Sequence, residues 1–328
     1  MIADSPKVCL NGACVRSASP EIADFRIENG VICFPAQCPA KANQRDGVTH
    51  MDKDDLKTEL ALRGEILYGD DFSAEEIAQW FEDEREGYFN LYYGGDNPIG
   101  AEGAPYEYEQ LAEQHCFKWL PPREFESVLG IGSAYGAELK PILKRIQRVT
   151  IVDPSDGFAS TTIDGKPVTY VKPQPTGLMP FAPASFDIVV CFSVLHHIPN
   201  VSTVIGEVYR VLKPGGYALL REPTHSMGDW RQPRRGLTKR ERGIPLQIFR
   251  RIVCGAGFSV VRETRCVFSL MSRLSPLTGG RSVWTSRGLV KIDRAICALP
   301  IWPQKYGDQH WWHKFRPIAV SFVLKKPD

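Results

Sequence analysis

From Glu126 onward, short apolar runs alternate with segments of helical periodicity, and this alternation restricts the possible folds most strongly. We expect strands at 127–131, 149–152, 168–171, 186–192, 217–221, 258–264 and 318–324. Helices are expected between them at 137–146, 201–212 and 246–256. The run 186–192 is nearly continuous in apolar residues, as in a strand that is covered on both faces. Strands that alternate with helices predict an α/β fold with a doubly wound parallel sheet.

The residues before this region divide into two further parts. Residues 1–50 form an expected small cysteine-containing module, in which Asn29-Gly30 separates two short apolar runs and predicts a hairpin. Residues 51–122 are expected to form a helical cap. Asp70, Asp71 and Ser73 precede a helix at 74–84, and 106–119 is a second amphipathic segment. Residues 123–328 would then be the α/β domain.

Charge and composition restrict the class of protein. The chain has 40 basic and 38 acidic residues, a near-balance that gives no reason to expect nucleic acid as a partner. We see no signal peptide and no apolar run long enough to span a bilayer. Cys191, Cys254 and Cys266 lie in apolar segments, and buried free thiols favour a reducing compartment. We therefore expect a cytoplasmic protein.

Two segments carry the signature of a nucleotide-binding crevice. The first is VLGIGSAYG at 128–136, a strand that runs into a loop of small residues before a helix. Such a loop lets the backbone approach a ligand closely, and the helix behind it favours a carboxylate. The second is TIVDP, where Asp153 ends the next strand and is placed to accept hydrogen bonds from ribose hydroxyls.

Two later segments make the pattern specific. They are PFAPASFDIVVCFSVLHHIPN at 180–200 and EVYRVLKPGGYAL at 207–219. In this order, the four segments resemble the class I S-adenosylmethionine-dependent methyltransferase family, of the methyltransferase type 11 kind. The resemblance implies a Rossmann-like sheet and S-adenosylmethionine as the cofactor, and it makes 224–317 the acceptor-side region.

The resemblance also implies which residues touch the cofactor. Those with an implied binding role are Gly130, Gly132, Ser133 and Gly136 at the methionine end, Asp153 and Pro154 at the ribose, and Gln174, Phe192 and Ser193 at the adenine side. The sequence departs from the family at three places. Gly130 replaces an acid, Ala134 replaces a glycine, and Gln174 occupies the region of an aspartate that reads the adenine amino group.

The expected reaction is methyl transfer to oxygen or nitrogen of a small or glycan-like metabolite. A methyl group on a sulfonium is already activated, so alignment supplies much of the acceleration, and a general base helps a hydroxyl acceptor. Candidate catalytic residues are His196, His197, Glu222 and His225. Alternatively, one of the two histidines only caps or packs the turn before Pro199, and Glu222 is a loop carboxylate paired with Arg221.

Two other functions compete with this interpretation. A non-catalytic binding or partner subunit would explain Gly130 and Ala134. A dinucleotide oxidoreductase would require Gly-x-Gly-x-x-Gly, whereas the spacing here is Gly130-x-Gly132-x-x-x-Gly136.

Three further features have two interpretations each. The basic run at 230–242 is expected either to grip an anionic acceptor or, as we favour, to be a solvated insertion. Tyr88, Tyr92 and Tyr93 either fold over the cofactor or pack against the preceding helix. The aromatic segment 310–315 either faces a membrane or sugar or, as we favour, packs on the core.

Four cysteines raise the question of zinc. Two cysteine pairs, Cys9 with Cys14 and Cys33 with Cys38, offer four thiolates that could hold a structural zinc. Some similar methyltransferases carry a small zinc-ribbon-like domain, and residues 25–34 resemble the hairpin of that domain. Four residues separate the partners of each pair, whereas zinc knuckles usually have two. We therefore favour a degenerate module without metal.

Overall fold

The computed structural model describes residues 53–92, 105–303, 305–307 and 311–328, together with four short N-terminal strands. β1 (Lys7–Leu10) pairs with β2 (Ala13–Arg16), and β3 (Arg26–Glu28) pairs with β4 (Val31–Cys33). Glu28 lies opposite Val31, which confirms the hairpin predicted at Asn29-Gly30. The side chains of Cys9, Cys14, Cys33 and Cys38 lie outside the described residues, so zinc binding there stays an untested prediction.

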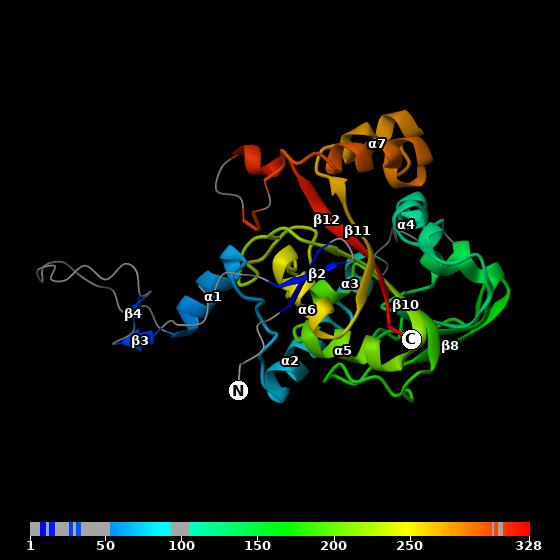
Figure 1. Ribbon diagram of the computed structural model, residues 1–328, viewed down its shortest axis with the longest axis horizontal. Helices are drawn as coiled ribbons and strands as arrows, with labels where there is room; N and C mark the ends of the chain where they lie inside the picture. Colours follow the sequence, from blue (N-terminus) through cyan, green and yellow to red (C-terminus); the bar gives the residue numbers. More distant parts are fainter. Residues whose placement is uncertain are drawn as a thin grey trace, which may run out of the picture.

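An eight-stranded sheet forms the centre of the fold, with the order β11-β12-β10-β9-β5-β6-β8-β7 (Figure 1). Its strands are β5 (Phe125–Ile131), β6 (Ile146–Val152), β7 (Thr162–Ile163), β8 (Lys166–Val171), β9 (Phe186–Phe192), β10 (Leu212–Pro223), β11 (Ser259–Phe268) and β12 (Pro317–Lys325). The strands β8, β6, β5, β9 and β10 are parallel, whereas β7, β12 and β11 pair antiparallel with their neighbours. The parallel strands follow the Rossmann order, which confirms the predicted α/β fold.

The helices surround this sheet in chain order. The α-helices are α1 (Lys53–Arg63), α2 (Ala74–Glu84), α3 (Gly87–Tyr92), α4 (Glu109–His115), α5 (Val201–Val211), α6 (Leu246–Gly255) and α7 (Arg287–Cys297). The 3-10 helices are η1 (Phe117–Trp119), η2 (Ala137–Arg145), η3 (Leu195–His197), η4 (Met271–Thr278), η5 (Val283–Thr285) and η6 (Trp311–Lys314). No helix in the described part of the chain is long and apolar enough to cross a membrane.

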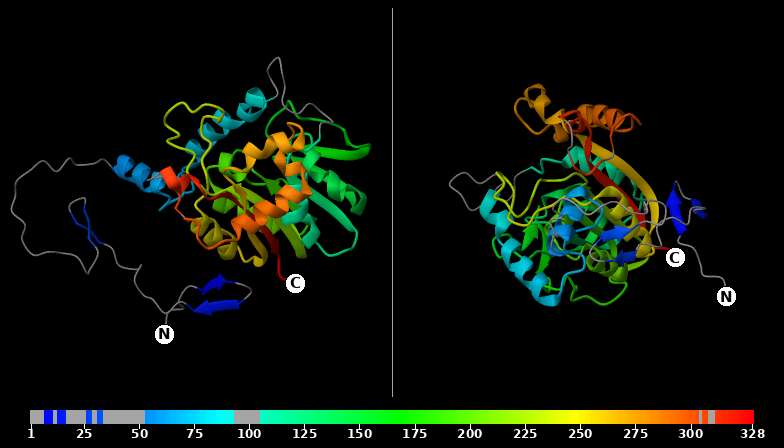
Figure 2. Two further views of the ribbon diagram at one scale, coloured as in Figure 1. Left: turned by 90° about the horizontal axis from the view of Figure 1, so that it is seen from above. Right: turned by 90° about the vertical axis from the view of Figure 1, so that its left-hand side faces the viewer.

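Helices cover the sheet on both faces (Figure 2), and an apolar cluster is buried on each face. On one face, Ile205 of α5 and Phe249 of α6 pack with Leu220 and Phe322. On the other face, residues of α4, η1 and η2 pack with Leu219, the neighbour of Leu220 in β10. Successive strand residues point to opposite faces, so both layers of helices are held by the same strands. The chain reverses direction across the sheet between β5 and β9, where ligands of such sheets bind at the carboxyl ends of the strands.

Several expected elements differ from the observed ones. The helix expected at 137–146 is a 3-10 helix over Ala137–Arg145, and Pro141 in its middle has no N–H to donate. The segment 106–119 divides at Cys116 into α4 and η1. The last strand of the parallel set extends over Leu212–Pro223 because the chain passes through an irregularity around Gly215 and then resumes its pairing with β9.

A third apolar cluster lies beyond the sheet, where η4, η5 and α7 pack against β11, β12 and α4. Met271, Trp284 and Val290 are its buried members from these three helical segments. Figure 1 shows α7 at one end of the molecule, above α4. The cluster therefore fixes one side of α7 to the domain and leaves the other side outward.

Candidate functional site

The loop after β5 is shaped by backbone conformations that glycine adopts easily. Gly132 and Gly136 have φ of 59° and 70°. A Cβ atom on Gly132 would lie 2.5 Å from Cγ1 of Val194, and one on Gly136 would collide with Ile163. The loop therefore fits closely between the segment after β9 and the β7 edge. Ala134 also has a positive φ, 45°, at the position where the family usually has glycine.

Asp153 closes this loop from the end of β6. Its Oδ2 accepts a hydrogen bond from Ala134 N at 3.1 Å, and its Oδ1 accepts one from Ser155 N at 3.0 Å. Burial raises the pKa of Asp153 to about 6, although these two hydrogen bonds oppose the rise. The carboxylate is therefore ionised at neutral pH, and each oxygen retains a lone pair for a further donor.

Three buried polar groups lie on the same side of the sheet near this loop. Ser133 Oγ and Arg221 Nη1 are buried without a hydrogen-bond partner, and Arg221 Nη2 donates to Tyr106 Oη at 2.7 Å. Glu138 in the first turn of η2 is also buried, and burial raises its pKa to about 7. Ser133 fills the volume into which a Cβ on Gly130 would project. Buried polar groups without partners are rare, so these atoms fit a polar ligand.

The carboxyl end of β9 carries a strained residue. Ser193 is exposed, has a φ of 59°, and donates from its N–H to Arg221 O at 2.6 Å. Phe192 precedes it and is buried beneath the guanidinium of Arg221, 4.9 Å from ring centre to the guanidinium carbon. Non-glycine residues with positive φ concentrate at functional sites.

Glu222 is fully buried and holds the segment after β9 in place. Its Oε1 accepts hydrogen bonds from Val194 N and Leu195 N, each at 2.9 Å, and its Oε2 lies 2.8 Å from His196 Nδ1. These hydrogen bonds occupy both carboxylate oxygens of Glu222, and the side chain is shielded from solvent. The expectation that Glu222 deprotonates an acceptor therefore does not fit its position, because a base must reach its substrate.

His196 lies between two carboxylates. Nδ1 contacts Glu222, and Nε2 lies 3.4 Å from Oε1 of Glu241. Burial alone would lower the pKa of His196, but hydrogen bonds to Glu222 and Glu241 raise it to about 9. The side chain is thus an imidazolium at neutral pH. Both ring nitrogens of His196 face carboxylates and the ring is buried, so its position favours a structural role over that of general base.

His197 has a different environment. Its Nδ1 lies 2.8 Å from Oε2 of Glu84 in α2, and Thr238 Oγ1 donates to the same carboxylate oxygen at 2.6 Å. A carboxylate on Nδ1 favours the tautomer with the proton there, which leaves Nε2 as the nitrogen that can accept a proton. His197 is half-buried, and its ring centre lies 6.3 Å from that of Tyr88.

The same histidines are a candidate metal cluster. His196, His197 and Glu241 offer ligand atoms that all lie within 4.8 Å of one another, a grouping found once among the described residues. The Thr238 hydroxyl lies within this group, 3.1 Å from His197 Nδ1 and 3.2 Å from Oε2 of Glu241. These hydrogen bonds explain why the three side chains lie close together, so their closeness does not itself indicate a metal ion.

Helices α2 and α3 extend over the loops that follow β6 and β9. Trp80 Nε1 donates to His197 O at 2.7 Å, and Oε2 of Glu86 accepts from Ser155 Oγ at 2.7 Å. In α3, the Phe89 ring lies 5.2 Å from that of Phe158. Tyr88 thus lies near the site, as the sequence suggested, whereas Tyr93 and the side chain of Tyr92 lie outside the described residues.

The remaining predicted residues lie at the margins. Pro154 O accepts from Lys172 Nζ at 3.0 Å, beside Asp153. Gln174 is exposed in the turn after β8, where its backbone N–H donates to Leu178 O. His225 Nδ1 lies 3.1 Å from the backbone oxygen of Ile318, at the start of β12.

The basic run 230–242 is exposed at Arg231 and Arg235, but other cations of the run are anchored to the rest of the protein. Arg242 is buried and donates to backbone oxygens, from Nε to Tyr68 and from Nη2 to Ile198 and Pro199. Lys239 and Arg240 both bind Asp83 of α2. Part of the run therefore connects the helical cap to the segment after β9, while its other residues stay exposed, so the favoured interpretation holds for only part of the run.

Sequence reasoning missed the residues that complete the site. Glu84, Glu138, Thr238 and Glu241 were not proposed, and Arg221 was considered only as a partner of Glu222. His197 and Glu84 are 113 positions apart, and no local pattern links residues at such separations. The capping motif at Ser73 fixes where α2 starts, but it does not indicate where its last turn docks.

Comparison with known proteins agrees with this geometry. Residues 129–220 match the family model described as a methyltransferase domain. This segment is a methyltransferase domain. It extends from β5 to β10 and contains the loop 132–136, Asp153 and both histidines, whereas α1–α3 and everything after Leu220 lie outside it.

Relatives of the methyltransferase domain match it over short segments. The ubiquinone biosynthesis O-methyltransferase of Dechloromonas aromatica is 35% identical over 98 residues, which are 28% of this chain and 42% of that protein. The phthiotriol/phenolphthiotriol dimycocerosates methyltransferase 1 of Mycobacterium ulcerans is 37% identical over 70 residues, which are 19% and 26% of the two chains. The chain thus spans less than half the length of these relatives.

A solved structure that resembles the chain is that of the N-methyltransferase NodS from Bradyrhizobium japonicum. It is 14% identical, the match covers 76% of this chain and all of that one, and the TM-score is 0.46. The fold assignment depends on the strand order and directions described above.

Proposed function

We propose that this chain transfers a methyl group from S-adenosylmethionine to oxygen or nitrogen of a small or glycan-like metabolite. One observation carries the proposal: the loop 132–136 closes onto Asp153, with Ala134 N donating to its carboxylate, at the carboxyl ends of β5 and β6. The bound cofactor would supply an activated methyl group on a sulfonium. The methyltransferase domain match over the same residues supports this proposal.

The proposed cofactor site uses the residues that the sequence singled out. Its members are Gly130, Gly132, Ser133, Gly136, Asp153, Pro154, Gln174, Phe192 and Ser193. Asp153 would accept from the ribose hydroxyls. Ser133 Oγ and Arg221 Nη1, the buried donors without partners, fit a carboxylate at the methionine end. Glu138 fits the ammonium group beside it and would act in place of the acid that the family usually has at position 130.

We propose His197 as the general base and His196 and Glu222 as positioning residues. His197 combines a partly exposed ring with a carboxylate on Nδ1, the arrangement that keeps Nε2 ready for a proton. His196 and Glu222 fix the backbone from Val194 to His197 through buried hydrogen bonds. His225 has no such place in the proposed reaction, because it contacts the β12 edge.

The acceptor is proposed by chemistry alone. A hydroxyl requires a base, which His197 supplies, and matched relatives named as O-methyltransferases agree with an oxygen acceptor. The cations of 230–242 that bind Asp83 and backbone oxygens no longer support an anionic acceptor. We therefore propose an oxygen acceptor first.

Calorimetry and a labelled-methyl assay test the proposal. Asp153→Ala should weaken binding of S-adenosylmethionine by at least about ten-fold, because hydrogen bonds to a charged group are worth roughly 1.5–3 kcal/mol. Asp156→Ala is the matched control, since that side chain is exposed and pairs with Lys172. A screen of hydroxyl and amine acceptors with labelled donor would then identify the substrate.

Two outcomes would contradict the proposal. If the wild-type chain does not bind the cofactor in large excess, the fold serves another role, such as a non-catalytic partner. If Asp153→Ala binds as tightly as wild type, the ribose assignment is wrong. His197→Gln should leave cofactor affinity unchanged and lower kcat, and equal turnover in that variant would remove it as the base.

A further inference from the structure

The C-terminal segment 271–316 exposes an unusual number of large apolar side chains. Six of the eleven exposed large apolar residues in the described chain lie in it. They are Leu277 (72% exposed), Ile292 (50%), Leu299 (44%), Ile301 (70%), Trp311 (70%) and Trp312 (50%). The expectation that the aromatic tail packs on the core is therefore corrected for Trp311 and Trp312. We call these six residues and the exposed cations among them the basic–apolar surface.

The helix α7 is two-sided within this surface. Val290, Asp293 and Cys297 are buried against the domain, whereas Lys291 and Ile292 are exposed on the other side. Asp293 accepts hydrogen bonds from the backbone N–H groups of two β11 residues, which fixes the buried side. The exposed side therefore presents cations and apolar groups together, the pattern of helices that lie in a membrane interface.

Cations dominate the charge of this surface. Its exposed basic residues are Arg273, Arg281, Arg287, Lys291, Lys305 and Lys314. The acidic residues of 271–316 are Asp293, which is buried, and Asp308, which lies outside the described residues. The neighbouring helix α4 packs against α7 and carries Glu109, which is exposed, and Glu113, which is half-buried. No described carboxylate of this segment is thus exposed to balance its cations.

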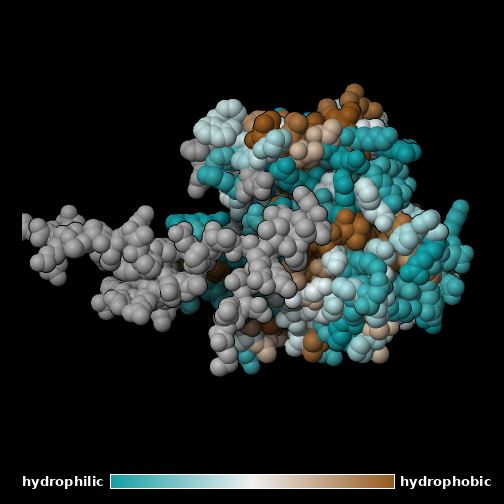
Figure 3. Space-filling view, viewed as in Figure 1, coloured by the Kyte–Doolittle hydropathy of each residue, from teal (hydrophilic) through white to brown (hydrophobic). Residues whose placement is uncertain are grey.

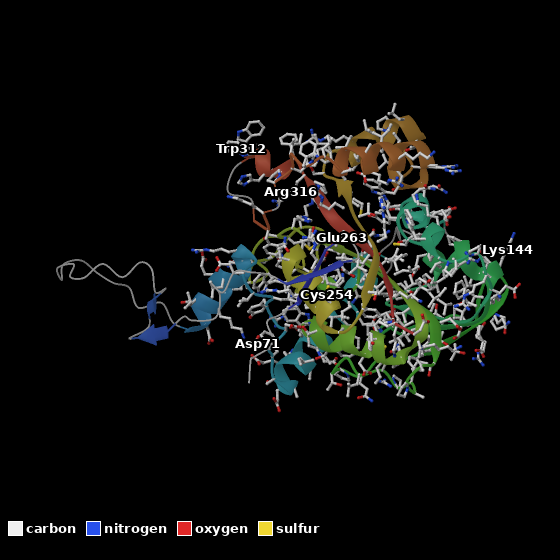
Figure 4. The ribbon with its side chains drawn as sticks, viewed as in Figure 1. Asp71, Lys144, Cys254, Glu263, Trp312 and Arg316 are labelled. Atoms are coloured by element: carbon white, nitrogen blue, oxygen red, sulfur yellow. The ribbon has the colours of Figure 1, made fainter. Side chains whose placement is uncertain are left out.

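The apolar groups and cations lie at the same end of the molecule. Figure 3 shows apolar residues gathered along the end that carries α7, between hydrophilic ones. Figure 4 shows Trp312 at that end, pointing outward from η6, while Arg316 lies nearer the core. Trp311 and Trp312 contact each other edge to face, with ring centres 6.0 Å apart. Two adjacent exposed indoles suit the boundary between lipid headgroups and acyl chains, where tryptophan concentrates.

We propose that the basic–apolar surface binds the headgroup region of an anionic lipid bilayer. The exposed apolar side chains would enter the interface, and the surrounding cations would meet negative headgroups. A second copy of this chain would place cations against cations, so self-association at this surface is disfavoured. The inference is independent of the proposed methyl transfer, because it uses residues outside the methyltransferase domain.

Sedimentation of the full chain with vesicles tests the inference. Vesicles of phosphatidylcholine with about a third phosphatidylglycerol should bind the protein at low salt, and phosphatidylcholine alone should bind it much more weakly. Trp311→Ser/Trp312→Ser should lower the partition coefficient at least about ten-fold. Lys291→Glu should lower it about five-fold or more, since each cation near such a surface contributes about that factor. Raised salt should weaken binding of the wild type.

Val261→Ser is the matched control, because Val261 is exposed to 45% on β11 but lies outside the basic–apolar surface. It should leave the partition coefficient unchanged. Melting temperatures and cofactor affinities of all variants should equal those of wild type, which separates this test from that of the proposed function. If wild type stays in the supernatant, or the tryptophan variant sediments equally, the inference is overturned. Self-association that disappears in the same variants, without vesicle binding, would instead identify a protein interface and also overturn it.

Discussion

At the scale of single residues, two residues of the candidate site have a positive φ, a backbone conformation that residues other than glycine rarely adopt. Ala134 and Ser193 have φ of 45° and 59°, and both lie in loops that follow strands converging on the candidate site. The two loops contact each other where Gly132 approaches Val194. Strain of this kind persists only where the surrounding structure fixes the backbone, so we interpret both residues as parts of a preorganised crevice.

Replacing Ala134 with glycine should raise the stability of the fold. A left-handed conformation costs an L-residue roughly 1–2 kcal/mol, and the entropy of glycine in the unfolded chain offsets part of the gain. We expect the free energy of unfolding to rise by up to about 1 kcal/mol, measured by urea denaturation. Ala137→Gly, within η2, should instead lower it by about 0.5–1 kcal/mol. A destabilised Ala134→Gly variant would show that the alanine methyl group contributes packing that outweighs its strain.

His196 should make stability depend on pH. Its pKa rises from 6.5 to about 9 because Glu222 and Glu241 outweigh the effect of burial. Below pH 6.5 the folded and unfolded chains both hold the proton, so the full stabilisation is present; it disappears as the pH rises toward 9. The rise corresponds to a contribution on the order of 3 kcal/mol at low pH, part of which remains at neutral pH.

Urea denaturation of wild type and His196→Gln between about pH 6 and about pH 9.5 measures this effect. The difference in unfolding free energy between the two should shrink with increasing pH, by at most about 1.4 kcal/mol per pH unit. The neighbouring His197 is retained in both proteins. A difference that stays constant over this range would mean that folding leaves the pKa of His196 at its ordinary value, and a difference that grows with pH would mean that the fold holds His196 neutral.

The sequence predicts individual site residues only where they lie within a local motif. Asp153 and the glycines of 132–136 follow from a strand, a loop and a helix in succession. Glu84 and Glu241 do not, because they reach the histidines through helices and loops whose docking depends on tertiary packing. The role of His196 could not be predicted either, since its protonation depends on two carboxylates that are distant in sequence.

At the scale of elements, agreement depends on whether the local signal is complete. The helix Ala74–Glu84 begins at Ser73 with both hydrogen bonds of a capping box, and β9 matches the expected 186–192. The helix predicted at 137–146 is present as the 3-10 helix η2, a type that apolar periodicity alone does not reveal because Pro141 changes the hydrogen bonds. The extension of β10 was missed because a Lys-Pro-Gly-Gly sequence normally ends a strand.

Removing the cap of α2 should loosen the helices above the site. Ser73 Oγ accepts from Glu76 N, and the Glu76 carboxylate accepts from Ser73 N at 2.8 Å. Ser73→Ala should lower the local stability of α2 by about 1 kcal/mol, which is about a five-fold faster hydrogen exchange of its amides. Amides of β5 and β9 should exchange as in wild type. Equal acceleration throughout the chain would indicate that α2 unfolds only with the whole domain.

At the scale of the whole molecule, the candidate site and the basic–apolar surface occupy different parts of one fold. The site lies where β5, β6 and β9 end, beneath α2 and α3, whereas α7 and η6 lie beyond the β11–β12 edge. The sequence predicted the first part because strands and loops follow in a familiar order. It did not predict the second, because apolar residues in 271–316 divide between a buried cluster and an exposed face, and their spacing does not distinguish the two.

Cofactor binding should therefore stabilise the molecule unevenly. A ligand that binds only the folded chain raises its stability by about 2.7 kcal/mol at about a hundred-fold excess over Kd. With the demethylated product S-adenosylhomocysteine, local protection from hydrogen exchange should concentrate in 132–136, 153–158 and 193–198. The amides of α3 should also gain protection, because Glu86 binds Ser155 and Asp156. Helix α7 should change only as far as global stability does, and Asp153→Ala should lower the stabilisation by at least about 1.4 kcal/mol at the same ligand concentration. Protection centred on α7 would place the ligand in the C-terminal region instead, and the crevice at the β5–β9 boundary would then have another role.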